Sequence, residues 1–199
     1  MEAIVFPLSR NSSRIRPKNW IEFSLGLDRA VMSDVPAPDD YSEKEVYAFF
    51  GLAAYTAQVL EKALVNMVVI FKTCALPISV AQYDEIFTDH DSRTIGQLLR
   101  RARSAQIPIP EDTERLLENA LEQRNYLNHD FYADHAGHFM TEQGRNTMID
   151  RLKELTRIFV RAERACEPIY SPLMKKMGVT PESVEQHVQE LIAEAHDRA

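Results

Sequence analysis

Six consecutive residues, Arg124 to His129, carry the side chains of this chain that are best suited to chemistry. Arginine has a permanent positive charge and a planar fork of N–H donors that fits a phosphate. Histidine both takes up and releases a proton near neutral pH. Together, an arginine and a histidine provide a minimal set of groups for cleaving a phosphodiester without a metal ion.

The spacing of these two residues can be compared with helix geometry. Five residues at ~100° each separate Arg124 from His129 by about 140° on an ideal helix, so the two side chains do not share a face. Arg124 instead pairs with Asn128 at i,i+4, and Asn125 pairs with His129. We therefore expect that the helix ends or distorts near Asn128, or that a second copy of the chain supplies the missing group, as a two-fold dimer does.

The residues around this motif resemble the signature of the HEPN superfamily. In that family an arginine, often followed by Asn, Asp or His, precedes a histidine after a gap of four to six residues. Here the gap is four and the polar residue is Asn125. The similar segment is Glu122–Phe131, and Gly51–Leu64 resembles the first long helix of the family. The resemblance covers roughly residues 42–166.

The resemblance implies a metal-independent endoribonuclease that needs no cofactor and works as a homodimer. Arg124, Asn125 and His129 would be its catalytic residues. Arg124 would hold the scissile phosphate of an RNA substrate, and His129 would move the proton as the ribose 2′-hydroxyl attacks. The resemblance also implies a toxin or phage-defence effector restrained by an antitoxin or another regulatory protein.

Three further residues complete the predicted site. Tyr126 is a candidate for stacking a base, and Asn128 is a candidate for substrate binding. Glu61 lies on the inner side of the upstream helix and is the expected supporting partner of Arg124.

Each of these candidates has a structural alternative. A buried ion pair between Arg124 and Glu61 is sufficient on structural grounds. His129 suits the C-terminus of a helix, where the dipole favours a cation, and Tyr126 suits packing or an interface. The second hypothesis is therefore a non-catalytic helical dimerisation or scaffold module that keeps the motif as an interface network.

A polar cluster follows the motif and consists of Asp130, Asp134, His135 and His138. Two histidines at i,i+3 are able to hold a metal ion in principle. No cysteine or carboxylate pattern completes such a site, so we predict a polar loop over residues 130–140 and no metal.

Two basic clusters are candidates for contact with an RNA backbone. Acidic residues lie beside the larger one, which favours a solvated surface with salt bridges, and the same interpretation applies to the smaller one. The larger cluster comprises Lys153, Arg157, Arg161 and Arg164, and the smaller comprises Arg100, Arg101 and Arg103.

The composition bounds the class of protein. The chain has 199 residues, of which 45% are hydrophobic, enough for one domain with a core. Its net charge of −7 argues against a protein that coats nucleic acid by bulk electrostatics, but not against a local positive site. No run of about 18 apolar residues and no signal pattern is present, so we expect a cytoplasmic protein outside the membrane. Cys74 and Cys166 have no metal-type spacing, which predicts free thiols.

Helical periodicity and only six glycines predict an all-α fold, an antiparallel helical bundle with a C-terminal helical extension. Residues 1–40 hold four of the ten prolines and a basic stretch, and they predict an irregular arm that contains a short helix at 20–27. The basic residues of the arm are candidates for contact with RNA, and the alternative is a solvated arm. Residues 41–199 form a single helical bundle domain, with a capping box at Ser42–Glu45 and a cap at Asp91 or Ser92. The expected helices are 42–73, 80–87, 94–105, 111–128, 141–166, 168–177 and 180–196.

Overall fold

The computed structural model describes residues 35–73, 80–91 and 94–176, and positions 185–186, 189–190, 192–193 and 196. Throughout this part of the chain the regular structure is helical and contains no strand. The predicted all-α class is therefore confirmed there. Most of the N-terminal arm, Cys74, Ser92 and most of the predicted last helix lie outside the described residues.

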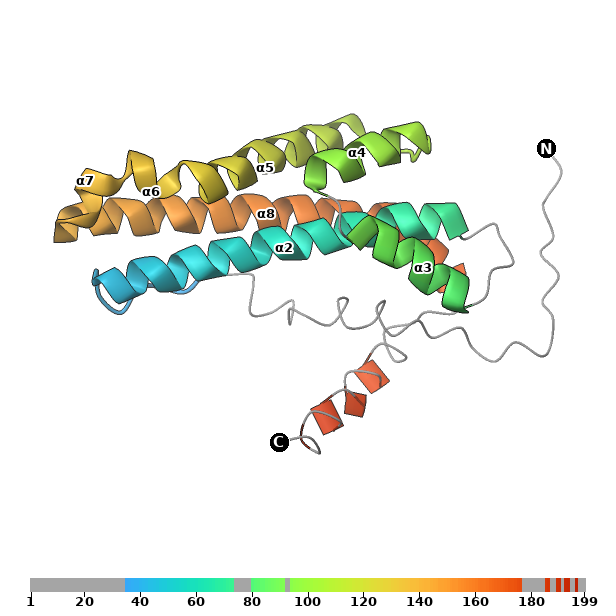
Figure 1. Cartoon of the computed structure of the whole chain (residues 1–199), viewed down its shortest axis with the longest axis horizontal. Helices are drawn as coiled ribbons and strands as arrows, with labels where there is room; N and C mark the ends of the chain where they lie inside the picture. The colour runs from blue at the N-terminus through green and yellow to red at the C-terminus, as the bar shows by residue number, and fades with distance from the viewer. Residues whose placement is uncertain are drawn as a thin grey trace, which may run out of the picture.

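Two long helices form the body of the fold. These are α2 (Glu43–Thr73) and α8 (Glu142–Lys176), which pack side by side (Figure 1). The Arg145 guanidinium near the start of α8 donates to the carbonyl oxygen of Tyr41 just before α2, so both helices begin at the same end of the molecule. The motif helix α5 (Glu111–His129) packs on both and runs in the opposite direction (Figure 1).

Four shorter helices precede α8 along the chain. Near the C-terminal end of α2, α3 (Val80–Asp91) and α4 (Ile95–Ser104) pack on that helix (Figure 1). At the other end, α6 (Phe131–Asp134) and α7 (Ala136–Phe139) connect α5 to α8 (Figure 1). The motif helix is therefore held along its length by α2 and α8, and at its C-terminal end by the short helices that follow it.

The core is built around α2. Residues 63–70 of this helix are all buried, so it is covered around its whole circumference there. Of the helices in the described ranges, α2 is the one with the length and composition to span a membrane, and 67% of its apolar window is buried inside the protein. Because most of this window is buried against other helices, the apolar composition of α2 fits a central helix of the core.

The predicted capping box at the start of α2 forms by half. The Glu45 N–H donates to Ser42 Oγ at 3.4 Å, as expected. The Ser42 N–H, however, donates to Asp40 Oδ1 at 2.9 Å, so Asp40 does what Glu45 was expected to do. Hydrogen bonds from the side chain and the backbone N–H of Ser42 hold the pKa of Asp40 below its usual value.

The prediction of a loop over residues 130–140 is wrong, because most of this segment is helical. Phe131 is fully buried, and its ring contacts Phe50 of α2 at 5.9 Å between centroids. This anchor directs the chain back toward α2, and α6 begins immediately after Asp130. Of the polar residues and the glycine that suggested a loop, Asp130, Asp134, Gly137 and His138 are exposed, whereas His135 is half-buried between the two single-turn helices.

The predicted break after Cys166 is also wrong, because α8 continues to Lys176 through Pro168 and Pro172. A proline inside a helix removes one backbone hydrogen bond and normally ends the helix. Apolar side chains on both sides of these prolines pack against the core and keep this stretch helical, namely Ile158, Ile169, Tyr170, Leu173 and Met174.

Smaller differences concern α3 and α4. The second expected helix extends beyond Phe87 to Asp91. Asp91 is therefore the last residue of α3, and Thr94 rather than Asp91 is the N-cap of α4. The Thr94 N–H donates to Gln97 Oε1 at 3.1 Å and satisfies one of the free donors at this helix start.

Candidate functional site

Arg124 lies on the side of α5 that faces α2, where it meets the predicted partner. Its Nη2 is 3.0 Å from Glu61 Oε1, and the two side chains are 22% and 21% exposed. The contact is an ion pair without hydrogen-bond alignment, since Glu61 Oε1 is buried and has no hydrogen-bond partner. Within the described residues Glu61 is the ion-pair partner of Arg124, so the rest of the guanidinium fork is not engaged by protein groups.

The motif helix is regular through its whole length. The Asp130 N–H donates to the Tyr126 carbonyl oxygen at 2.9 Å, so the helical hydrogen bonds continue past Asn128 to the C-cap. The helix ends at His129, one residue past Asn128, as expected, but it does not distort before that point, so Arg124 and His129 both lie within its regular turns. The other expectation, a second copy that completes the site, stays a prediction.

Four polar side chains follow one another around this helix. Steps of about 40°, 60° and 40° separate Arg124, Asn128, Asn125 and His129 on an ideal helix. Arg124 is half-buried, and the other three are exposed. The strip therefore leads from an anchored guanidinium at α2 to an imidazole in solvent, with two amides between them. We call these four residues the motif strip.

Tyr126 lies on the other side of α5, toward α8. The Arg151 guanidinium is 5.2 Å from its ring centroid, within the range of a cation–π contact. Its hydroxyl is 3.1 Å from His135 Nε2, and its ring meets Phe131 edge-on at 6.1 Å. The ring and hydroxyl of Tyr126 are thus engaged inside the protein, as the packing alternative expects.

The two histidines after the motif are linked to each other. His135 Nδ1 is 3.1 Å from His138 Nδ1, which extends the hydrogen-bonded chain from Tyr126. Burial, with smaller effects from His138 and Arg151, lowers the pKa of His135, and Asp134 opposes this. No group of three or more His, Cys, Asp or Glu side chains able to hold a metal ion occurs in the described ranges.

Two of the three arginines of the smaller basic cluster, Arg101 and Arg103, form salt bridges, and Arg100 is exposed. Arg103 contacts Glu114 at 2.6 Å and Glu118 at 2.5 Å. Arg101 contacts Asp89 at 3.0 Å. These arginines tie α4 to its neighbours, which agrees with the alternative of a salt-bridged face.

The larger basic cluster on α8 is more open. Lys153 lies 3.9 Å from Asp150. Arg157, Arg161 and Arg164 are exposed, and none of them has an ion-pair partner in the part of the chain that the structure describes. These three arginines lie opposite the buried stripe of α8 and are free to contact a polyanion.

Two features were not anticipated from the sequence. Exposed Tyr47 of α2 and Tyr132 of α6 have ring centroids 6.2 Å apart and adjoin the end of the motif helix. At the other end of α2, His90 is buried between Lys72 and Arg101. Both arise from contacts between distant helices, and neither has a local sequence signal.

Comparison with protein-family models, curated proteins and solved structures gave no match to this chain.

Proposed function

We propose that the chain is a HEPN-type, metal-independent endoribonuclease with an antiparallel HEPN-like bundle, acting in the cytoplasm as a homodimer. The observation that carries this proposal is the motif strip. Glu61 anchors Arg124 through one nitrogen and leaves its other donors unengaged, while Asn125, Asn128 and His129 continue outward on the same helix. A phosphate bound at Arg124 would lie beside Asn128, and the imidazole that acts on it would be His129 of a second copy, because the two side chains of one helix are about 140° apart.

In the proposed reaction, Arg124 binds the scissile phosphate and stabilises the charge that develops on its oxygens. His129 accepts the proton of the ribose 2′-hydroxyl, or donates one to the leaving 5′-oxygen. The 2′-oxygen forms a bond to phosphorus as the bond to the 5′-oxygen breaks. The products are a 2′,3′-cyclic phosphate end and a 5′-hydroxyl end, and the proposed reaction requires no metal or cofactor. Asn125 and Asn128 orient the phosphate or the imidazole.

The proposal extends by resemblance to the biological role. An enzyme of this kind acts as a toxin or phage-defence effector, and an antitoxin or another regulatory protein restrains it. The net charge of −7 fits an enzyme that engages RNA at a local site rather than over its whole surface.

A second candidate is a non-catalytic dimerisation or scaffold module. The observation that favours it is the position of Arg124, which faces α2 and has an acidic partner there. In this case the motif strip is an interface network, and Arg124 serves stability rather than catalysis.

The test is cleavage of RNA by purified protein in EDTA, with analysis of the product ends. His129→Ala is the decisive variant because His129 is exposed at the end of α5 and its loss does not disturb the core. We expect wild-type protein to produce cyclic phosphate ends and His129→Ala to lose at least about 100-fold in rate. His196→Ala, at another exposed histidine, serves as the matched control and keeps full activity. A folded His129→Ala protein that cuts RNA at the wild-type rate would refute the proposed ribonuclease function, and the scaffold module would remain as the candidate.

A further inference from the structure

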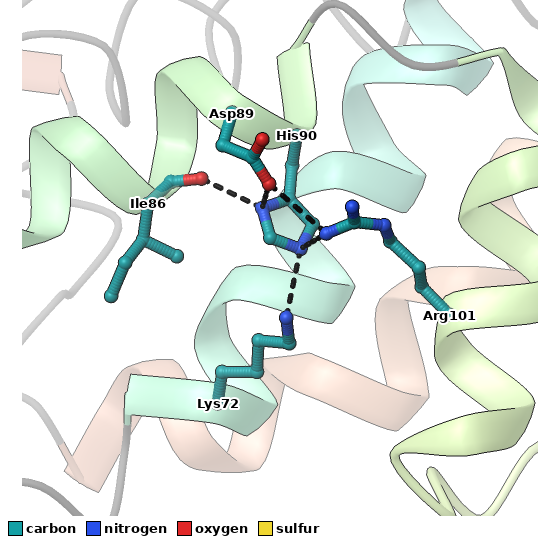
Figure 2. Close-up of polar contacts among 5 residues, drawn as sticks. All are labelled: Lys72, Ile86, Asp89, His90 and Arg101. Atoms are coloured by element: carbon teal, nitrogen blue, oxygen red, sulfur yellow. Dashed lines mark hydrogen bonds and ion pairs between the residues drawn. The ribbon is translucent and has the colours of Figure 1, made fainter.

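His90 is a buried histidine whose two ring nitrogens both have protein partners (Figure 2). It lies in the last turn of α3, and only 2% of its surface is exposed. Nδ1 is 2.7 Å from the carbonyl oxygen of Ile86. Because a carbonyl oxygen only accepts, Nδ1 carries the proton and donates it. Nε2 of the neutral ring is then an acceptor.

Two cations from two other helices converge on this acceptor (Figure 2). The Lys72 ammonium of α2 and Arg101 Nη1 of α4 each lie 3.1 Å from His90 Nε2. Both groups only donate, so both bonds require an unprotonated Nε2. Among the side chains that the structure describes, the nearby carboxylate is Asp89 of α3, whose Oδ2 is 3.0 Å from Arg101 Nη1 and 3.6 Å from His90 Nδ1. The neutral ring thus joins three helices at one point.

We propose that Lys72, His90 and Arg101 form an acid-released latch: protonation of His90 Nε2 breaks its hydrogen bonds to Lys72 and Arg101 and releases α3 from α2 and α4. The proton would occupy the position toward which Lys72 and Arg101 donate, so both hydrogen bonds are lost at once. It would also add a third positive charge within hydrogen-bond distance of two others, on a ring that is itself buried. Asp89 offsets only part of this repulsion, because its closer contact is with Arg101.

The latch acts on α3 because His90 lies in the last turn of this helix, and its two cationic partners belong to the two helices beside it. α3 packs on α2, and among its described side chains Asp89 and His90 contact Arg101 of α4. Of the α3 side chains that the structure describes, Ile86 is the apolar one that packs against the core. Helices α2, α5 and α8 share a large buried core, so they remain folded when α3 is released.

The direction of the pH dependence follows from the same contacts. Burial lowers the pKa of His90 below 6.5, as do the charges of Lys72 and Arg101, against opposing effects of the Ile86 bond and Asp89. Once α3 is released, the imidazole returns to its ordinary pKa near 6.5. Below about pH 6.5 the open state therefore binds a proton that the closed state does not. The latch is fully effective above this pH and weakens as the pH falls toward the lowered pKa of the closed state.

Hydrogen exchange of residues 80–91, corrected for the intrinsic effect of pH, measures the opening of α3 directly. In wild-type protein we expect protection of these amides to fall by up to about tenfold for each pH unit below 6.5. Protection of the buried middle of α8 should not change over the same range. Equal protection of α3 at about pH 7.5 and pH 5.5 would overturn the proposal.

The variant His90→Gln tests whether this histidine is responsible. Glutamine is neutral at every pH and offers both an acceptor and donors, so we expect the pH dependence of α3 exchange to disappear. His196→Gln makes the same change at an exposed histidine and should behave like wild type. A pH dependence that persists in His90→Gln would overturn the proposal.

Lys72→Met gives a second test that keeps the ring in place, should His90→Gln fail to fold. Removing one cation raises the pKa of His90 in the closed state toward the value of 6.5 in the open state. Because the two pKa values then lie closer together, the amides of α3 should lose less protection as the pH falls. Lys175→Met, at an exposed lysine near the end of α8, is the matched control. Nuclear magnetic resonance titration of the His90 ring in wild-type protein completes the test, since a pKa at or above 6.5 contradicts the latch.

Discussion

Arg124 has two partners in the proposed reaction, Glu61 on α2 and a phosphate of the substrate. The two roles are compatible because Glu61 contacts one nitrogen and the planar fork has further donors. Glu61 thereby limits the rotation of the guanidinium before substrate arrives. At the same time the carboxylate competes with the phosphate for the positive charge, so the ion pair lowers the affinity for the phosphate as the cost of positioning.

If Arg124 and His129 act as one catalytic unit, their substitutions are not additive. Each single change to Ala removes most of the activity, and the double variant loses little more. Arg124→Lys also fails, because a point charge does not replace the bidentate fork. Steady-state rates of RNA cleavage for the four variants provide the measurement, and a double variant whose loss is the product of the single losses would contradict a shared site.

Folding must be measured beside these rates. Arg124→Ala leaves the buried Oε1 of Glu61 without its counter-charge, which costs about 1–3 kcal/mol of stability. His129→Ala removes an exposed side chain and should change the free energy of unfolding by no more than about 0.5 kcal/mol. Denaturant unfolding therefore separates a catalytic loss at His129 from a structural loss at Arg124.

Cys166 provides a prediction about thiol chemistry. It is fully buried in α8, and burial raises its pKa to about 12. Its thiol also donates to the Ala162 carbonyl oxygen at 3.4 Å. In a Cys74→Ser variant we expect no reaction of the native protein with a thiol reagent at about pH 8, and full reaction after denaturation. Rapid labelling of native protein would show that Cys166 is not held in the core.

At the scale of helices, periodicity predicted the elements that bury a continuous apolar stripe. The bounds of α2 and α5 differ from expectation by one residue at most at either end. The predicted partner of Arg124 also followed from this pattern, because Glu61 and Arg124 both lie on inward faces of their helices. The Lys72–His90–Arg101 junction could not be predicted in this way, since it depends on how α3 and α4 are placed on α2.

The errors in predicting elements have the same origin. Residues 130–140 and the prolines of α8 carry local signals against helix, and those signals are correct about propensity. Tertiary packing overrides them. Phe131 places α6 against Phe50, and Leu173 and Met174 hold the end of α8 on the core. A local sequence pattern does not contain these contacts.

The junction of α7 and α8 depends on a glycine. A Cβ atom at Gly144 would collide with the His138 carbonyl oxygen, and backbone cannot move aside easily. We expect Gly144→Ala to lower the free energy of unfolding by about 1–3 kcal/mol. Gly51→Ala is the matched control in α2, where nothing lies within 4 Å, and it should raise stability by about 0.5–1 kcal/mol. Equal effects of the two changes in denaturant unfolding would contradict this account.

At the scale of the whole molecule, the regular geometry of α5 makes the dimer prediction sharper. Because the helix does not distort, Arg124 and His129 stay about 140° apart and one protomer does not aim both side chains at one phosphate. A two-fold interface containing α5 brings Arg124 of one protomer toward His129 of the other. We expect light scattering at micromolar concentration to give twice the mass of the chain. An active monomer would rule out this arrangement.

Mixing two inactive variants distinguishes a shared site from a site within one protomer. Arg124→Ala and His129→Ala are each inactive alone, but a heterodimer of the two has one composite site with both native side chains. After random exchange of subunits half of the dimers are mixed, so about one quarter of wild-type activity should return. A site within one protomer gives no recovery, because each chain lacks one group. Size-exclusion chromatography of differently tagged variants verifies that exchange has occurred, so absence of activity in confirmed heterodimers would contradict the composite site.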